Sequence, residues 1–350
     1  MEQEKRIKRA KAERAAKQRK ARRRKRIFFL AGESVIFLLL LYMLFASVKY
    51  EKLQGYLWGN SDYKTIAVFG VDSKEGNLGA GAYSDTMMLI SIHPQNKEVK
   101  VVSVYRNLLT MQADGTIRTA KEAYFHGGPQ EAMDMLNKNF DLAISDYVSV
   151  DYTAVADLID LLGGLEWTLT EDEAAEMNLH MKETAALTGN TVAEVKSGLQ
   201  ILDGVKGLTY MRICKNVGGD IARTKRQEMM VTEILKKVQK AQITTVDKII
   251  GQIFTKISTS LTLKECMSLA VNGIQCKSME MKSYAFEYKE DSVQDIKNAI
   301  IPLGVKENVN ELHAFLYEGK DYHMTLAMKK TAQEIESFSG YSREDYEETE

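Results

Sequence analysis

The chain has 350 residues, 45% of them hydrophobic and 27% charged, so it can bury a sizeable core in one large domain or two small ones. The formal net charge of −1 conceals an asymmetry, because residues 1–26 hold 14 Lys or Arg and 3 Glu, whereas the remaining residues hold 33 basic and 45 acidic side chains. Cys214, Cys266 and Cys276 lack metal-type spacing and are too few for a disulfide scaffold. We expect three small buried hydrophobic residues, with a Cys266–Cys276 bridge as the alternative.

Residues 27–48 are apolar except for Glu33 and a few small polar residues, and about 20 apolar residues span a bilayer core as a helix. The basic run at 22–26 directly precedes them, so the positive-inside rule keeps the N-terminus cytoplasmic. A cleaved signal peptide is the competing interpretation. Because topology and contact with anionic lipid account for the basic tail, we expect no nucleic-acid partner.

The sequence therefore predicts a single-pass protein of the cell membrane with its C-terminal domain outside the cell. Its expected parts are a basic cytoplasmic tail at 1–26, a transmembrane helix at 27–48, a linker at 49–62, an extracellular domain at 63–338 and an acidic tail at 339–350.

From residue 63 the pattern becomes rich in strands. Residues 65–72 form an apolar run ending in Gly and Asp, which is typical of a strand buried on both faces. Residues 85–94 and 98–107 flank HPQNK and predict a hairpin. Pro129, at a tolerated early position, predicts a helix over 129–140. Further strands are predicted at 145–151, 165–170 and 278–289, and helices at 153–162, 171–178, 199–213, 224–241, 246–258, 262–274, 308–317 and 325–338.

Because strands and helices alternate, we predict an α/β fold with a mixed central sheet and helices on both faces, preceded by one transmembrane helix. In open α/β sheets, ligands bind beyond the strand ends. Asp72 and Lys74 follow the first predicted strand, Asp85 begins the second, and Arg106 ends the third. Further cations follow at Arg118, Lys121 and Arg212.

These residue types favour a phosphate ligand with a divalent metal. Carboxylate oxygens suit Mg²⁺, which is often shared with substrate phosphates, and arginine forks bind phosphate oxygens bidentately. A solvated rim of charges is the alternative.

The stretch GGDIARTKRQ, residues 218–227, places Arg223, Lys225 and Arg226 near the start of a predicted helix. A helix N-terminus disfavours cations, unless an anion lies between them. Arg223 and Arg226, three residues apart, share one helix face, and the helix N–H groups point towards the same anion. The pattern therefore predicts one wall of an anion site, with a solvated helix end as the alternative and Lys225 on the surface.

Six segments in order resemble one known family. They are FGVDS, YSDTMMLISIHPQNKEVKVVSVYRN, AYFHGGP, VDYTAVADLIDLLGGL, LDGVKGLTYMR and GGDIARTKRQ, spread over residues 63–240. Together they resemble the LytR-CpsA-Psr family, also called cell envelope-related transcriptional attenuator domains. The basic leader followed by one membrane helix is also this family's usual topology.

The resemblance implies an outward-facing phosphotransferase that moves a glycan from a polyprenyl-pyrophosphate carrier onto peptidoglycan or another wall acceptor. It implies Mg²⁺ or Mn²⁺ held by Asp72 and Asp85. It also implies phosphate-binding arginines, with the lipid tail in an apolar tunnel. The matching catalytic residues are Arg106, Arg223 and Arg226, and the substrate-binding residues are Lys74, Arg118, Lys121, Arg212 and Gln227.

Several positions depart from the family pattern. Asn107 replaces the usual Asp, Tyr83 and Cys214 replace usual arginines, Thr119 stands where a Lys is usual, and Lys74 replaces an Arg. Loss of a charged site group commonly costs about 10²–10⁴ in rate. The alternative function is therefore a degenerate member that binds lipid pyrophosphate or wall glycan without turnover. A transcription regulator is disfavoured by the expected topology.

Overall fold

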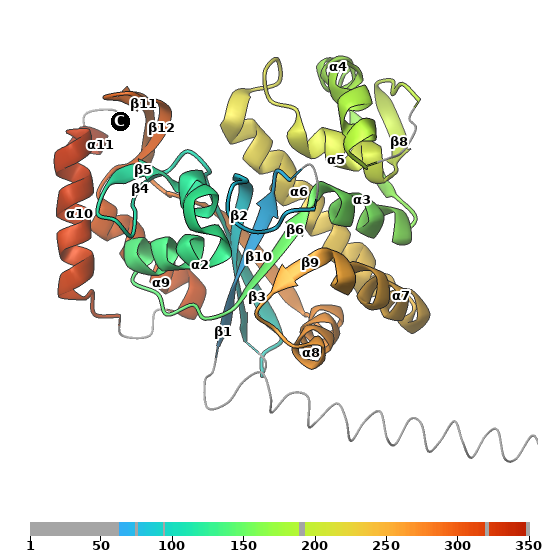
Figure 1. Ribbon diagram of the computed structural model, residues 1–350, viewed down its shortest axis with the longest axis horizontal. Helices are drawn as coiled ribbons and strands as arrows, with labels where there is room; N and C mark the ends of the chain where they lie inside the picture. Colours follow the sequence, from blue (N-terminus) through green and yellow to red (C-terminus); the bar gives the residue numbers. More distant parts are fainter. Residues whose placement is uncertain (1–62, 74–75, 94, 189–192, 319–321, 348–350) are drawn as a thin grey trace, which may run out of the picture. The chain divides into compact units, whose positions relative to one another are not determined.

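A six-stranded mixed sheet forms the centre of the fold in the computed structural model (Figure 1). The structure describes residues 63–73, 76–93, 95–188, 193–318 and 322–347, all within one compact unit, Leu57–Glu350. The predicted basic tail, transmembrane helix and linker lie outside these residues. Within the described part of the chain, no helix is both long and apolar enough to cross a membrane.

The sheet has the strand order β10-β3-β2-β1-β6-β9. β1 pairs with β6 and β10 with β3 in parallel, whereas the other neighbours are antiparallel, which confirms the predicted mixed sheet. The bounds are β1 Lys64–Val71, β2 Ser84–His93, β3 Glu98–Val104, β6 Tyr147–Asp151, β9 Ile257–Thr259 and β10 Ser278–Tyr284.

Helices cover both faces of the sheet, as predicted from the sequence (Figure 1). Side chains alternate along a strand, so Phe69 of β1 packs in the core with α2 (Ala120–Phe140) and α9 (Val305–Tyr317). Val68 lies in the opposite cluster, which includes Val231 of α6 and Leu269 of α8. The bounds of these helices are α6 Gly219–Lys240 and α8 Leu263–Ile274.

A third apolar cluster lies beside the sheet, where three further helices and a two-stranded ribbon pack against Met230 and Ile234 of α6. These elements are α3 Tyr152–Leu161, β7 Leu165–Leu169, α4 Glu171–Thr188, β8 Gly198–Leu202 and α5 Gly204–Arg212. The prediction of a helix over 199–213 is therefore wrong at its start, because residues 199–202 pair with β7 as a strand. Asp203 then caps α5 by accepting a hydrogen bond from Lys206 N.

Two further hairpins lie outside the central sheet. β4 and β5 form one of them, and β11 and β12 form the other. The second hairpin corrects the single strand predicted at 278–289, because the chain turns after β10 and starts a new strand at Tyr288. The remaining bounds are β4 Leu109–Met111, β5 Ile117–Thr119, β11 Tyr288–Val293, β12 Ile296–Pro302, α7 Ile243–Ile253, a 3-10 turn η1 Phe254–Lys256, α10 Leu326–Ser339 and α11 Glu344–Glu347.

Several helix bounds differ from the predictions. α7 and α9 each begin three residues earlier than predicted, at Ile243 and Val305, and the helix predicted over 246–258 is wrong at its end, because residues 257–259 pair with β6 as the strand β9. The predicted helix start near Pro129 is confirmed, because Gly128 (φ 68°) has non-helical backbone angles and divides α2 into two segments; the first segment, which begins at Ala120, was not predicted. α6 begins at Gly219, so its first turn carries Asp220, which the helix dipole favours, and Arg223 lies beyond that turn. The premise that cations crowd the first turn is therefore wrong. Cys214, Cys266 and Cys276 are free, so the alternative disulfide is absent.

Candidate functional site

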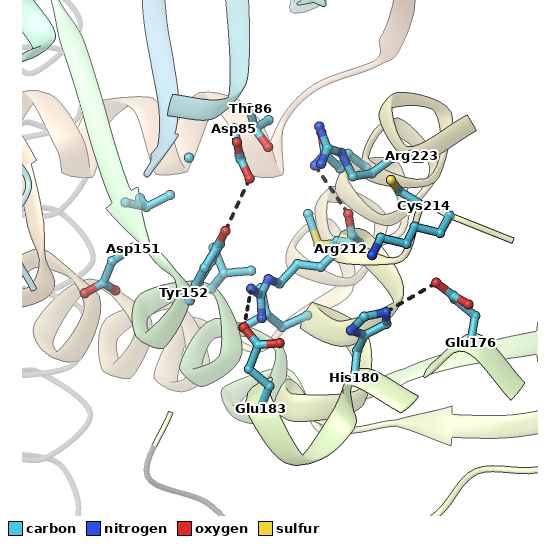
Figure 2. Close-up of a pocket in the computed structure, with 17 residues that line it drawn as sticks. Asp85, Thr86, Asp151, Tyr152, Glu176, His180, Glu183, Arg212, Cys214 and Arg223 are labelled. Atoms are coloured by element: carbon cyan, nitrogen blue, oxygen red, sulfur yellow. Dashed lines mark hydrogen bonds and ion pairs between the residues drawn. The ribbon is translucent and has the colours of Figure 1, made fainter. Parts of the chain in front are cut away.

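A cavity of about 250 Å³ opens where the sheet meets α4, α5 and α6 (Figure 2). β2 runs antiparallel to β1, so the first residues of β2 lie beside the last residues of β1, at one end of the two strands. Gly70 and Thr86 pair at this end and both line the cavity. The polar residues of the lining are Asp85, Thr86, Asp151, Tyr152, Glu176, His180, Glu183, Arg212, Cys214, Lys215, Arg223 and Gln227.

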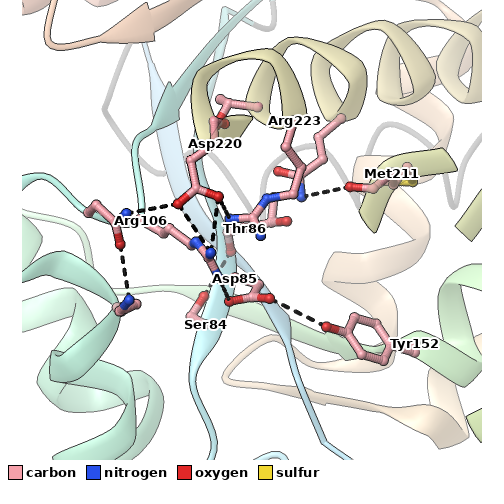
Figure 3. A network of polar contacts seen from close by, with 12 residues as sticks. Ser84, Asp85, Thr86, Arg106, Tyr152, Met211, Asp220 and Arg223 are labelled. Carbon is pink, nitrogen blue, oxygen red and sulfur yellow. Dashed lines mark hydrogen bonds and ion pairs between the residues drawn. The ribbon is translucent and has the colours of Figure 1, made fainter. Parts of the chain in front are cut away.

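A network of charges lies at one end of this cavity (Figure 3). Arg106, which follows β3, donates from Nη1 to Asp85 Oδ1 at 2.7 Å and from Nη2 to Asp220 Oδ1 at 3.0 Å. Arg223 Nη2 lies 3.1 Å from the same Asp220 oxygen. We call the following residues the charged cluster: Asp85, Arg106, Asn107, Lys121, Asp220 and Arg223.

Ion pairing keeps Asp220 and Arg106 ionised although both are partly buried. Burial raises the pKa of Asp220, but Arg223 and Arg106 outweigh burial, and the pKa ends below its usual range. Burial likewise lowers the pKa of Arg106, and Asp85 with Asp220 raises it above its usual range overall. The cluster therefore holds two carboxylates and three cations, an excess of one positive charge.

Asn107 occupies the centre of the cluster. Its Nδ2 donates to Asp220 Oδ2 at 2.8 Å, and its Oδ1 accepts from Lys121 Nζ at 3.0 Å. An aspartate here could accept from the lysine but could not donate to Asp220. Burial, followed by the charge of Arg106, lowers the pKa of Lys121. The amide therefore joins an anion to a cation without adding a charge.

Tyr152 connects the charged cluster to the opposite wall of the cavity. Its hydroxyl donates to Asp85 Oδ2 at 3.5 Å, and the Arg212 guanidinium lies 4.5 Å from its ring centroid. Burial raises the pKa of Tyr152, and the charge of Asp85 raises it further. The hydroxyl therefore stays protonated and remains a donor.

Arg226 and Gln227 both donate to backbone oxygens of the chain. Arg226 is 5% exposed and donates to the backbone oxygens of Ile213 (2.9 Å) and Val217 (3.0 Å). Gln227 lines the cavity but donates to Met211 O at 3.3 Å. The structure thus brings Arg106 and Arg223 together and places Arg226 as a brace for the loop between α5 and α6.

The remaining predicted site residues divide into three groups. Lys121 and Arg212 lie at the site, in the charged cluster and the cavity wall respectively. Arg118 does not line the cavity and pairs with Asp114 at 2.6 Å beside the β4–β5 hairpin. Lys74 lies outside the described residues.

The two predicted metal ligands differ in their surroundings. Asp85 accepts from Arg106 and Tyr152, as described above. Asp72 follows β1, its backbone N donates to Tyr83 O at 2.9 Å, and its carboxylate acts electrostatically on Tyr152. Among the residues that the structure describes, no three side chains of His, Cys, Asp or Glu are arranged to hold a metal ion.

Sequence reasoning missed several residues of the site. The sequence analysis gives Asp220 no role, although an Asp three residues before Arg223 on one helix is a usable signal. Tyr152, Glu176 and His180 have no sequence pattern that marks them as site residues. They reach the cavity only through the packing of α3 and α4 in the folded chain.

Solved structures of similar fold cover most of the chain. The crystal structure of a Streptococcus agalactiae protein matches with a TM-score of 0.67 at 20% identity, covering 83% of this chain and 95% of that one. A structure described as TagT bound to LIIa-WTA matches with a TM-score of 0.55 at 19% identity, covering 80% and 91%. These similarities support the α/β architecture.

Curated relatives match part of the chain. A protein of Halalkalibacterium halodurans named polyisoprenyl-teichoic acid–peptidoglycan teichoic acid transferase TagU is 27% identical over 211 residues, which is 59% of this chain and 64% of the relative. Biofilm regulatory protein A of Streptococcus mutans is 27% identical over 184 residues, 50% and 44% of the two chains. The matches thus span less than two thirds of these relatives. The model of the LytR_cpsA_psr family matches residues 44–316, most of the sequence, and the chain therefore belongs to this family.

Proposed function

We propose that this chain is a membrane-anchored phosphotransferase that moves a glycan from a polyprenyl-pyrophosphate carrier to peptidoglycan or another cell-wall acceptor. The observation that carries the proposal is the sharing of Asp220 by Arg106 and Arg223 at the edge of a polar cavity. The name of the Halalkalibacterium halodurans relative, a transferase between a polyisoprenyl-linked teichoic acid and peptidoglycan, supports the same reaction class.

The pyrophosphate is proposed to bind at the charged cluster. Arg106 and Arg223 bring two guanidinium groups together at Asp220, and Arg223 lines the cavity, so the two cations can contribute to one anion site. Lys121 adds a point charge, and Asp220 contacts both arginines and so fixes their positions relative to each other. Catalysis would then consist mainly of positioning and of electrostatic stabilisation of the transferring phosphate.

The lipid tail is proposed to occupy a second, apolar cavity of about 200 Å³ between the sheet and the helices α6 and α8. Its lining includes Val68 and Ile90 from the sheet, Leu235 from α6 and Leu269 from α8. Burying a hydrocarbon chain there is favourable by about 0.8 kcal/mol for each CH₂ removed from water. α6 borders both cavities, which suits a ligand with a charged head and a greasy tail.

Mg²⁺ or Mn²⁺ is proposed to bind at Asp85 and Asp72. Two carboxylates fit such an ion only if phosphate oxygens and water complete its shell, which is how Mg²⁺ is usually held in phosphate-binding sites. Once bound, the ion would neutralise part of the pyrophosphate charge. Arg226 would act by holding the loop after α5, and Arg212 would face the substrate from the cavity wall.

The location follows from the sequence and is also part of the proposal. Residues 27–48 would anchor the chain in the cell membrane as a single helix, with residues 1–26 in the cytoplasm. The domain described here would then face the outside of the cell, where wall acceptors are found.

Binding without turnover is the second candidate, and Asn107 is the observation that favours it. The amide uses both its polar ends within the protein, so it offers neither a charge for a metal nor a base for the acceptor. Tyr83, at another departing position, stacks on Phe125 with ring centroids 4.6 Å apart and adds no charge.

The test uses the full chain in detergent with a synthetic polyprenyl-pyrophosphate glycan, Mg²⁺ and peptidoglycan fragments. We expect release of polyprenyl phosphate, and a loss of about 10²-fold or more in rate for Arg223→Ala. Lys225→Ala, which removes an exposed cation from the same helix, is the matched control. Tight donor binding that depends on Arg223, without any release of polyprenyl phosphate, would instead establish the second candidate.

A further inference from the structure

The end of the cavity opposite the charged cluster holds a histidine backed by a buried carboxylate (Figure 2). His180 Nε2 lies 3.3 Å from Glu176 Oε1, one turn earlier on α4. Asn216, from the loop between α5 and α6, donates to Glu176 Oε2 at 2.6 Å. These three residues, Glu176, His180 and Asn216, are called the α4 dyad end, after the contact between the histidine and the glutamate, which both lie on α4.

Glu176 and His180 differ in their exposure to solvent, and this difference gives them different roles. Glu176 is 2% exposed, whereas the His180 side chain is 38% exposed and lines the cavity. Buried carboxylates persist in proteins when both oxygens find partners, and here the imidazole and the amide supply them. The carboxylate is thus a fixed support, and the imidazole is the group that a ligand can reach.

The same contact sets the tautomer of His180. An ionised carboxylate only accepts hydrogen bonds, so Nε2 must donate to Glu176. In the neutral ring the other nitrogen, Nδ1, then carries a lone pair. No hydrogen bond to Nδ1 is formed by any residue that the structure describes. The dyad therefore presents a proton acceptor whose orientation is set by a second group, the arrangement that general bases require.

A set of contacts links the charged cluster to helix α4, which carries this acceptor. Asp85 accepts from Tyr152, and Arg212 lies on the Tyr152 ring, as described above. Arg212 Nη1 in turn donates to Thr184 Oγ1 at 3.1 Å, and its Nη2 lies 3.6 Å from Glu183 Oε1. Thr184 and Glu183 follow His180 on α4, so the helix is held against the wall that begins at Asp85.

We propose that His180 is the general base for the acceptor hydroxyl and that Glu176 positions it. This inference rests on the phosphotransferase function proposed above. The acceptor oxygen forms a bond to the phosphorus that carries the glycan, and the bond from that phosphorus to the bridging oxygen breaks. Polyprenyl phosphate leaves with the electron pair. The hydroxyl proton passes to His180 Nδ1, the Glu176 charge stabilises the imidazolium, and the proton then returns to solvent.

The experiment measures glycan transfer and donor binding separately for the full chain in detergent. It compares the wild type with His180→Ala, His180→Asn and Glu176→Gln, with Lys182→Ala, an exposed residue of the same helix, as the control. We expect the His180 variants to transfer about 10²-fold more slowly while the Kd for the lipid pyrophosphate stays unchanged. Added imidazole restores part of the rate in His180→Ala but not in Glu176→Gln, which keeps its histidine.

Two outcomes distinguish this inference from the proposed function. If the wild type transfers glycan and folded His180→Ala or His180→Asn transfers it equally fast, the role of His180 is refuted and the phosphotransferase stands. If the His180 variants lose donor binding in step with transfer, the histidine belongs to the phosphate site and the inference again fails. A wild type that binds donor but never transfers glycan refutes both.

Discussion

The two ends of the cavity use opposite kinds of electrostatics. The charged cluster joins three cations and two carboxylates, and ion pairing keeps Asp220 and Arg106 ionised. The α4 dyad end has one buried carboxylate that serves one imidazole and one amide. The charged cluster can therefore bind an anion without any proton transfer, whereas the α4 dyad end presents an imidazole, His180, which can accept a proton.

Arg226 offers the largest expected effect, because it supports the connection between the two ends. It binds the backbone oxygens of Ile213 and Val217, on either side of Asn216. Arg226→Met keeps the side-chain length but leaves the buried Ile213 carbonyl and the half-buried Val217 carbonyl without this donor, so we expect the free energy of unfolding to fall by about 2–3 kcal/mol. Urea denaturation measures this loss, with the exposed Lys225→Met as control. A fall below about 0.5 kcal/mol, the size of ordinary surface changes, would contradict the bracing role.

Asp220→Asn tests the charged cluster alone. The asparagine keeps an oxygen but loses the charge that two arginines share, so we expect a loss of about 1–2 kcal/mol of unfolding free energy at neutral pH. The folded pKa of Asp220 is lowered, so its contribution is present above the unfolded value of about 4 and disappears as pH falls further. Denaturation at several pH values should show the two proteins converging below about pH 4. A gap that stays constant with pH would show that Asp220 stabilises the fold by other means.

Asn107→Asp has the smallest expected effect on stability, and it tests whether a divalent metal ion binds at the charged cluster. The new carboxylate would face Asp220 across the present 2.8 Å contact, with partial compensation from Lys121. We expect a loss of about 1 kcal/mol without metal, and a greater rise in Tm on adding Mg²⁺ than in the wild type. Thermal unfolding with and without Mg²⁺ measures both effects. An equal response of the two proteins would place any bound ion away from the charged cluster.

Much of the fold could be predicted because hydrophobic periodicity is a local signal. The apolar run at 65–72 and the hairpin that follows it became β1, β2 and β3. Residues 199–202 were misassigned because their strand exists only by pairing with β7, a contact that sequence spacing does not encode. The kink at Gly128 similarly hid the first two turns of α2.

The site was only partly predictable, for a related reason. Charge placement at strand ends identified Asp85 and Arg106, and helix spacing identified Arg223, all of which meet at the charged cluster. The same spacing rule gave Arg226 an equal place, because a sequence cannot show which guanidinium finds backbone carbonyls. His180 lay in an ordinary helical pattern and became notable only through the burial of Glu176.

The helix α6 also sets a length scale. Arg223 near its start and Leu235 twelve residues later border different cavities, and at 1.5 Å per residue they are separated by about 18 Å along the axis. For the lipid pyrophosphate proposed above, this helix would therefore set the distance between the charged head and the hydrocarbon tail. A single residue inserted between Arg223 and Leu235 would rotate the two ends of α6 by about 100° relative to each other. The number of residues between these two positions is therefore expected to be fixed by the length of the ligand.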